Sequence, residues 1–105
     1  MRIPAKFRVA GHTVTVVRNA RLAADTHGLW ENAKKRIRLA KFEPGTAESY
    51  KQQVFMHELV HCLCDTIGRA DLSENEGFVD AMSEALLQVL TTAEPAMLLR
   101  AKDEP

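Results

Sequence analysis

Hydrophobic and polar residues alternate in the N-terminal part of the chain and take helical spacing in the C-terminal part. Apolar side chains occupy every second position on either side of Ala10-Gly11, which predicts a β-hairpin of about 6–9 and 12–17. A second alternation predicts another hairpin within 29–42. The apolar positions of these strands are Phe7, Val9, Val14, Val16, Ile37 and Leu39.

Two helices are predicted after a loop that contains Pro44 and Gly45. We expect Thr46 to cap a helix that continues to about Ile67. Gly68 is well placed to end that helix. A second helix is predicted over about 74–92, where apolar residues recur every three or four positions, at Val79, Met82, Leu86, Val89 and Leu90.

These patterns predict an α+β fold. A small, mostly antiparallel sheet of three or four strands would pack on the first helix, with the second helix beside it. At 105 residues the chain is large enough for one hydrophobic core. We therefore expect a single domain over 1–95, followed by a C-terminal tail over 96–105, since Pro95 interrupts the helical pattern.

The charge balance and hydropathy narrow the class of protein. Lys plus Arg and Asp plus Glu number 14 each, so the formal net charge is zero, which argues against a general electrostatic attraction to nucleic acid. No apolar run approaches the roughly 20 residues that span a bilayer. No apolar signal segment follows Met1. We expect a cytoplasmic protein that binds neither nucleic acid nor membrane.

The two cysteines, Cys62 and Cys64, both lie on the first predicted helix. Side chains two positions apart on a helix point about 200° away from each other, so these two cannot form a disulfide within the helix. We interpret them as small buried thiols rather than as metal ligands.

One motif carries chemistry: His57-Glu58-Leu59-Val60-His61, an H-E-x-x-H sequence inside the first predicted helix. Residues four apart share a helix face, so both imidazoles can bind one metal ion from the same side. Glu58 lies about 100° further round, beside that ion, where it can accept a proton from a bound water. The motif predicts two zinc ligands and a catalytic general base.

A third ligand is expected at Glu76, near the start of the second helix. Hydrolytic zinc sites use three protein ligands and leave a position for water. Asp80 lies one turn later on the same face, where it can accept the second N–H of a ligand histidine. Other interpretations exist: Ser73 and Glu76 fit a capping box, and Glu74 is a rival ligand.

H-E-x-x-H followed on the next helix by E-x-x-x-D resembles the gluzincin branch of the zinc metallopeptidases. The small size and short spacing are more similar to minimal zincin-like peptidases of phages and prophages, distantly related to the ImmA/IrrE-like and SprT-like groups. The resemblance covers roughly residues 28–92. It implies a single Zn²⁺ held by His57, His61 and Glu76, with Glu58 as the base and Asp80 as the partner of His57.

The resemblance also implies an activity, a substrate class and a location. The activity would be hydrolysis of peptide bonds in the cytoplasm, that of the host cell if a phage encodes the protein. An extended peptide or protein substrate would add to an edge strand at 36–41, although the basic residues there would equally protect an exposed edge. Tyr50 lies seven residues before His57, on nearly the same helix face. The donor to the oxyanion stays open among Tyr50, His12, His27 and Arg69.

Two alternatives to a peptidase remain. A catalytically silent protein could use zinc to stabilise a small fold, and a structural site of that kind would need a fourth protein ligand. A phage or prophage regulatory module could use the same fold to bind a partner.

Overall fold

The computed structural model describes residues 1–93, which form four strands and three helices. The predicted 96–105 tail lies outside the described residues. The α+β fold is confirmed. The elements in chain order are β1 (Lys6–Val9), β2 (His12–Ala20), β3 (Gly28–Glu31), β4 (Arg36–Ala40), α1 (Glu48–Thr66), α2 (Ala70–Ser73) and α3 (Glu76–Thr92).

The four strands form one mixed sheet in the order β1-β2-β4-β3. β1 and β2 are the first antiparallel hairpin, and β3 and β4 are the second, as the alternating patterns predict. The two hairpins join through a parallel pairing of β2 with β4, in which Val16 lies opposite Ile37. The predicted edge strand at 36–41 is therefore wrong: β4 is an inner strand, and β3 is the outer strand on that side.

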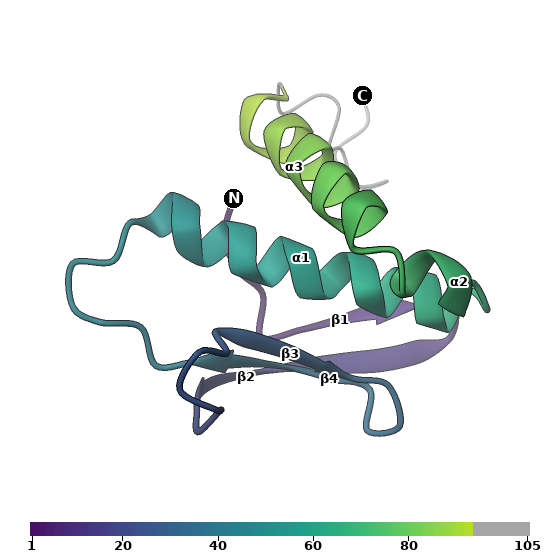
Figure 1. Cartoon of the computed structure of the whole chain (residues 1–105), viewed down its shortest axis with the longest axis horizontal. Coiled ribbons are helices and arrows are strands. Elements are labelled where there is room, and N and C mark those ends of the chain that lie inside the picture. Colours follow the sequence, from purple (N-terminus) through teal and green to yellow (C-terminus); the bar gives the residue numbers. More distant parts are fainter. Residues whose placement is uncertain (94–105) are drawn as a thin grey trace, which may run out of the picture.

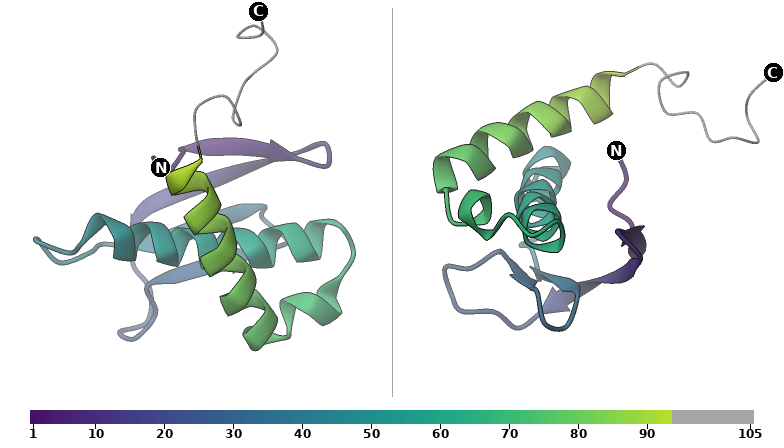
Figure 2. Two further views of the ribbon diagram at one scale, coloured as in Figure 1. Left: turned by 90° about the horizontal axis from the view of Figure 1, so that it is seen from above. Right: turned by 90° about the vertical axis from the view of Figure 1, so that its right-hand side faces the viewer.

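The layers are a sheet, then α1, then α3 (Figures 1 and 2). α1 lies along one face of the sheet, and α3 crosses α1 on the side away from the sheet (Figure 2, right). No described helix covers the other face of the sheet. Among the described residues, no helix combines the length and apolar character needed to cross a membrane.

Two hydrophobic clusters hold α1 from opposite sides. The first lies between the sheet and α1, and its fully buried members include Val14, Ile37 and Cys62. The second lies between α1 and α3, around Val60, Cys64 and Val79. α1 is thus apolar on two sides, which leaves a narrow polar strip for the H-E-x-x-H side chains.

The helix ends differ in detail from the expectation. α1 is capped at Ala47, which has no side-chain hydrogen bond to the helix, whereas Thr46 Oγ1 donates to the Glu43 carbonyl at 2.6 Å. Gly68 does follow α1, at a φ of +81° that suits glycine. Asn75 caps α3 by accepting from the Phe78 N–H at 3.0 Å.

The predicted apolar face of α3 is only partly buried. Val79 is fully buried and Leu86 packs against the second cluster. Met82 and Val89 are 38% and 48% exposed. The helical spacing therefore identifies the element correctly but assigns too broad a buried face to it.

Candidate metal centre

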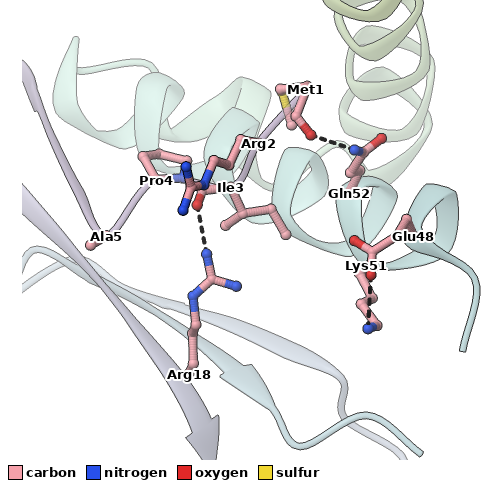
Figure 3. A pocket seen from close by; sticks show the side chains of 9 residues that line it. All are labelled: Met1, Arg2, Ile3, Pro4, Ala5, Arg18, Glu48, Lys51 and Gln52. Carbon is pink, nitrogen blue, oxygen red and sulfur yellow. Dashed lines mark hydrogen bonds and ion pairs between the residues drawn. The ribbon is translucent and has the colours of Figure 1, made fainter. Parts of the chain in front are cut away.

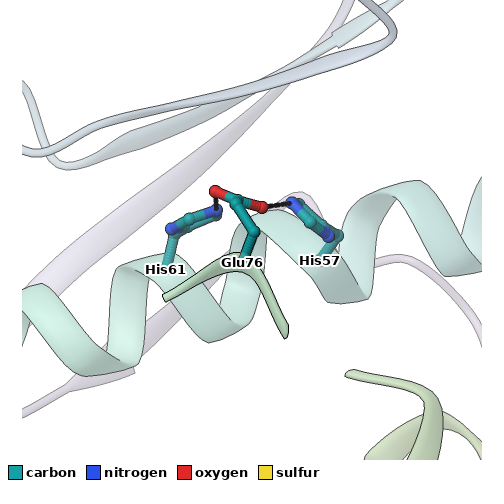
Figure 4. A group of neighbouring side chains, drawn as sticks. All are labelled: His57, His61 and Glu76. Atoms are coloured by element: carbon teal, nitrogen blue, oxygen red, sulfur yellow. Dashed lines mark ion pairs between the residues drawn. The ribbon is translucent and has the colours of Figure 1, made fainter. Parts of the chain in front are cut away.

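His57, His61 and Glu76 converge on one point beside α1 (Figure 4). The two histidines lie one turn apart on α1, and Glu76 is the first residue of α3. His57 Nε2 lies 3.4 Å from Glu76 Oε2, and His61 Nε2 lies 3.4 Å from Glu76 Oε1. One donor atom from each residue lies within 4.8 Å of the others. The structure thus brings together the three predicted ligands.

The other nitrogen of each imidazole also faces a polar partner. His57 Nδ1 lies 3.1 Å from Asp80 Oδ1, and His61 Nδ1 lies 2.9 Å from Ser73 Oγ. A carboxylate beside Nδ1 favours the tautomer with its proton on that atom. The Nε2 lone pair of His57 then points toward the Glu76 carboxylate. A cation bound between the Nε2 lone pair and the Glu76 carboxylate would remove the electrostatic repulsion between them.

The distances fit an ion of the size of zinc. With ligand bonds of about 2.0–2.1 Å and tetrahedral angles, two donors on one zinc lie roughly 3.4 Å apart. The two nitrogen–oxygen distances of 3.4 Å, one to each oxygen of the Glu76 carboxylate, are of this size, and both exceed the 2.7–3.2 Å range of ordinary N–H···O hydrogen bonds. The donor set of two imidazoles and one carboxylate also suits Zn²⁺.

Ser73 is the site residue that the sequence interpretation missed. The spacing to Glu76 suggested a capping box, but Asn75 caps α3 instead. Ser73 ends α2, a single helical turn between α1 and α3. Its side chain is buried and faces His61. No local pattern marks this role, because it depends on how α2 folds back against α1.

Glu58 is placed between α1 and the outer strand β3. A Cβ added to Gly28 would lie 3.0 Å from Glu58 Cγ, so the strand passes directly over this side chain. Burial raises the pKa of the Glu58 carboxyl, while the positive charges of His57 and His61 and the backbone N–H of Trp30 lower it. The net effect is a raised pKa, so the Glu58 carboxylate binds a proton more readily than an exposed glutamate does. It lies next to His57, His61 and Glu76.

A hollow of about 390 Å³ opens beside Glu58 and His57. Tyr50 and His27 line the same hollow, and the Tyr50 hydroxyl is hydrogen-bonded to His27 Nδ1. The expected position of Tyr50 on the histidine side of α1 is confirmed. His27 comes from the segment just before β3.

The other two oxyanion-donor candidates lie elsewhere. His12 is paired with Val9 where β2 begins, at the turn of the first hairpin. The Arg69 guanidinium donates to both carboxylate oxygens of Asp71, at 2.9 and 2.8 Å. Neither residue lines the hollow beside Glu58. Of the four candidates for the oxyanion donor, only His27 and Tyr50 line this hollow.

The cysteines take no part in the candidate centre. Cys62 and Cys64 are free and buried, as expected. They belong to different hydrophobic clusters, on opposite sides of α1. Burial raises the pKa of both thiols, which keeps them protonated at neutral pH.

Another pocket, of about 940 Å³, is remote from this chemistry. It lies between the N-terminal segment and the first turns of α1 (Figure 3). Two of its polar side chains bond to the N-terminal segment: Arg18 donates to the Ile3 carbonyl at 2.6 Å, and the Gln52 amide donates to the Met1 carbonyl. These bonds attach the N-terminal segment to β2 and α1.

Comparisons with protein-family models, with curated proteins and with solved structures gave no match.

Proposed function

We propose that this protein is a zinc-dependent metallopeptidase. The observation that carries the proposal is the convergence of His57, His61 and Glu76, with a half-buried Glu58 beside them. Among the described residues, the ligand group contains three His, Cys, Asp or Glu side chains. Three is the number typical of a catalytic zinc site, whereas a structural site uses four. This count favours the enzyme over a silent zinc-binding domain.

The zinc ion, when bound by these residues, would polarise the substrate carbonyl and make a water molecule more acidic. Glu58 takes a proton from that water as its oxygen attacks the carbonyl carbon. The C–N bond then breaks, and Glu58 gives the proton to the departing amine nitrogen. The desolvated surroundings of Glu58 suit it to both transfers, because they raise the proton affinity of its carboxylate.

A peptide substrate fits the sheet edge next to Glu58. β3 is an outer strand, and Gly28 at its start lies against the Glu58 side chain. An extended peptide that pairs with the free edge of β3 would bring one of its carbonyl groups to the site. The Tyr50 hydroxyl and the His27 imidazole, which line the hollow, are the donors we assign to the developing oxyanion.

The decisive experiment compares Glu58→Gln with the wild-type protein. Both are loaded with zinc, and the cleavage of a mixture of fluorogenic peptides is followed. We expect the variant to keep one zinc per chain and to lose hydrolysis by about 10²-fold or more, since a positioned general base contributes that much. Glu48→Gln is the matched control, because Glu48 lies on the exposed first turn of α1. Equal activity of Glu58→Gln and wild type would disprove the general-base role.

A further inference from the structure

A second hollow adjoins the one beside Glu58. It has a volume of about 540 Å³ and lies between the segment after β2 and the loop that joins β4 to α1. Thr26, His27 and Tyr50 line both hollows. The two spaces are therefore neighbours on either side of the His27–Tyr50 pair.

The wall that the two hollows share contains the rings of His27 and Tyr50, and Phe42 extends it within the second hollow. The rings of His27, Phe42 and Tyr50 contact one another edge to face, with centroids 5.6–6.3 Å apart. Such contacts are favourable and hold each ring in a defined orientation. The hydrogen bond between His27 and Tyr50 adds to this restraint. The wall is therefore built from rings that hold one another in place.

The rest of the second hollow is lined largely by small apolar groups. Four alanines contribute, together with Leu22 and the Phe42 ring. The charged side chains at its rim are Arg21 and Lys41 against a single carboxylate, Glu43. An apolar side chain would lose water-exposed surface in this space. A lysine or arginine side chain would meet two positive charges and one negative charge, which disfavours it.

We propose that this second hollow is a specificity pocket that receives a large apolar side chain of the substrate, such as leucine or phenylalanine. The inference rests on the proposed peptidase function, because the second hollow adjoins the hollow that Glu58 and His57 line and shares Thr26, His27 and Tyr50 with it. The shared aromatic wall would place the apolar side chain next to the scissile bond. The protein would then cleave peptides beside large apolar residues and discriminate against basic ones.

The test measures binding without turnover. The zinc-loaded Glu58→Gln protein is titrated with four peptides, acetyl-Ala-Ala-Xaa-Ala-Ala-amide with Xaa as Leu, Phe, Ala or Lys, and backbone amide shifts are followed by NMR. We expect the Leu and Phe peptides to bind about tenfold more tightly than the Ala and Lys peptides. Their largest shifts should fall within 20–27 and 40–46. Equal affinity for all four peptides would overturn the proposal.

Variants that fill the pocket provide the second test. Ala24→Leu and Ala23→Leu each add a bulky group to its lining, and Ala33→Leu, in the exposed turn between β3 and β4, is the matched control. Each variant is made in the Glu58→Gln background and checked for folding by thermal denaturation. At least one filled variant should lose the tenfold preference, and the control should keep it. A preference that survives in both folded variants contradicts the assignment.

The two proposals fail in different ways. If the wild-type protein cleaves peptides without regard to apolar residues, the pocket assignment is wrong and the peptidase remains. If the Leu and Phe peptides bind preferentially within 20–27 and 40–46 but zinc-loaded wild type cleaves none of them, the pocket remains and the peptidase is wrong.

Discussion

Asp80 Oδ1 lies 3.1 Å from Nδ1 of His57, on the side of the ring opposite Glu76. The two acidic residues lie one turn apart on α3, and they contact different nitrogens of one imidazole. On the proposed function, Asp80 would hold the proton on Nδ1, and Glu76 faces the nitrogen that would bind the metal. The E-x-x-x-D spacing thus gives two adjacent carboxylates separate roles.

Replacing Asp80 with alanine should weaken zinc binding by about 10–100-fold, the usual cost of losing the partner of a ligand histidine. The ring of His57 would lose the group that fixes its tautomer, while all three ligands remain. Affinity can be measured by competition with a chromogenic chelator. Ser73→Ala provides the equivalent test for His61, and we expect a loss of the same kind. Unchanged affinity in both variants would contradict the proposed roles of Asp80 and Ser73.

Glu76→Gln should remove most of the stabilisation that zinc gives to the fold. Zinc at a hundredfold excess over its dissociation constant contributes about 2.7 kcal/mol, which corresponds to a rise in Tm of about 10 °C or more for a domain of this size. We expect that rise in the wild type and a much smaller one in Glu76→Gln. Glu74→Gln is the control, since Glu74 precedes α3 and lies outside the ligand group. A similar loss in both variants would refute the specific role of Glu76.

Gly28→Ala should disturb the site through packing alone. The added Cβ would lie 2.8 Å from Val54 Cγ1 and 3.0 Å from Glu58 Cγ, so β3 or these side chains must shift. We expect a loss of about 1–3 kcal/mol in the free energy of unfolding, which is typical of overpacking, together with slower peptide hydrolysis. Urea denaturation and a peptide cleavage assay measure the two effects.

The matched control for that substitution is Gly77→Ala. Its Cβ would meet only Asn75 Oδ1, at an ordinary 3.5 Å, and Gly77 lies within α3. Alanine is the better helix former by up to about 1 kcal/mol, so this variant should be as stable as the wild type or more so. If Gly28→Ala and Gly77→Ala have the same free energy of unfolding and the same rate of hydrolysis, β3 does not pack tightly against Glu58.

Ala47→Asp should stabilise α1. Ala47 occupies the N-cap position with an extended backbone, and it offers no side-chain acceptor to the first turn. An aspartate there can accept from a free backbone N–H and interact favourably with the helix dipole. We expect a gain of about 0.5–2 kcal/mol in the free energy of unfolding by urea denaturation. Ala47→Val, which adds bulk without an acceptor, should give no gain.

The sequence predicted those features best that depend on a pattern within one element or one hairpin. Alternation located both hairpins, and the i, i+4 spacing placed His57 and His61 on one face, because these relations need only one element. The H-E-x-x-H and E-x-x-x-D motifs together predicted that Glu76 lies beside His57 and His61, as the structure places it. The expected N-cap at Thr46 failed because Ala47 takes the capping conformation while the Thr46 hydroxyl bonds back to the Glu43 carbonyl.

The relations that the sequence missed are all between elements. β4 is an inner strand because β2 pairs with it in parallel, and a hairpin pattern says nothing about how one hairpin joins another. Ser73 reaches His61 only because α2 forms a turn between α1 and α3. The second hollow depends on three aromatic rings that come from three different segments of the chain, before β3, after β4 and in α1. Each of these features is set by tertiary packing.

The placement of α1 between two small hydrophobic clusters has a consequence for life in the cell. Within residues 1–93, the helix that bears both histidines also packs against the sheet on one side and against α3 on the other. On the proposed function, an ion bound by residues of both α1 and α3 would link the two layers. When zinc is scarce this link would be lost, and we expect the unloaded chain to unfold more often and to be degraded faster by cellular proteases. The amount of protein present, and not only its activity, would then follow the supply of the metal.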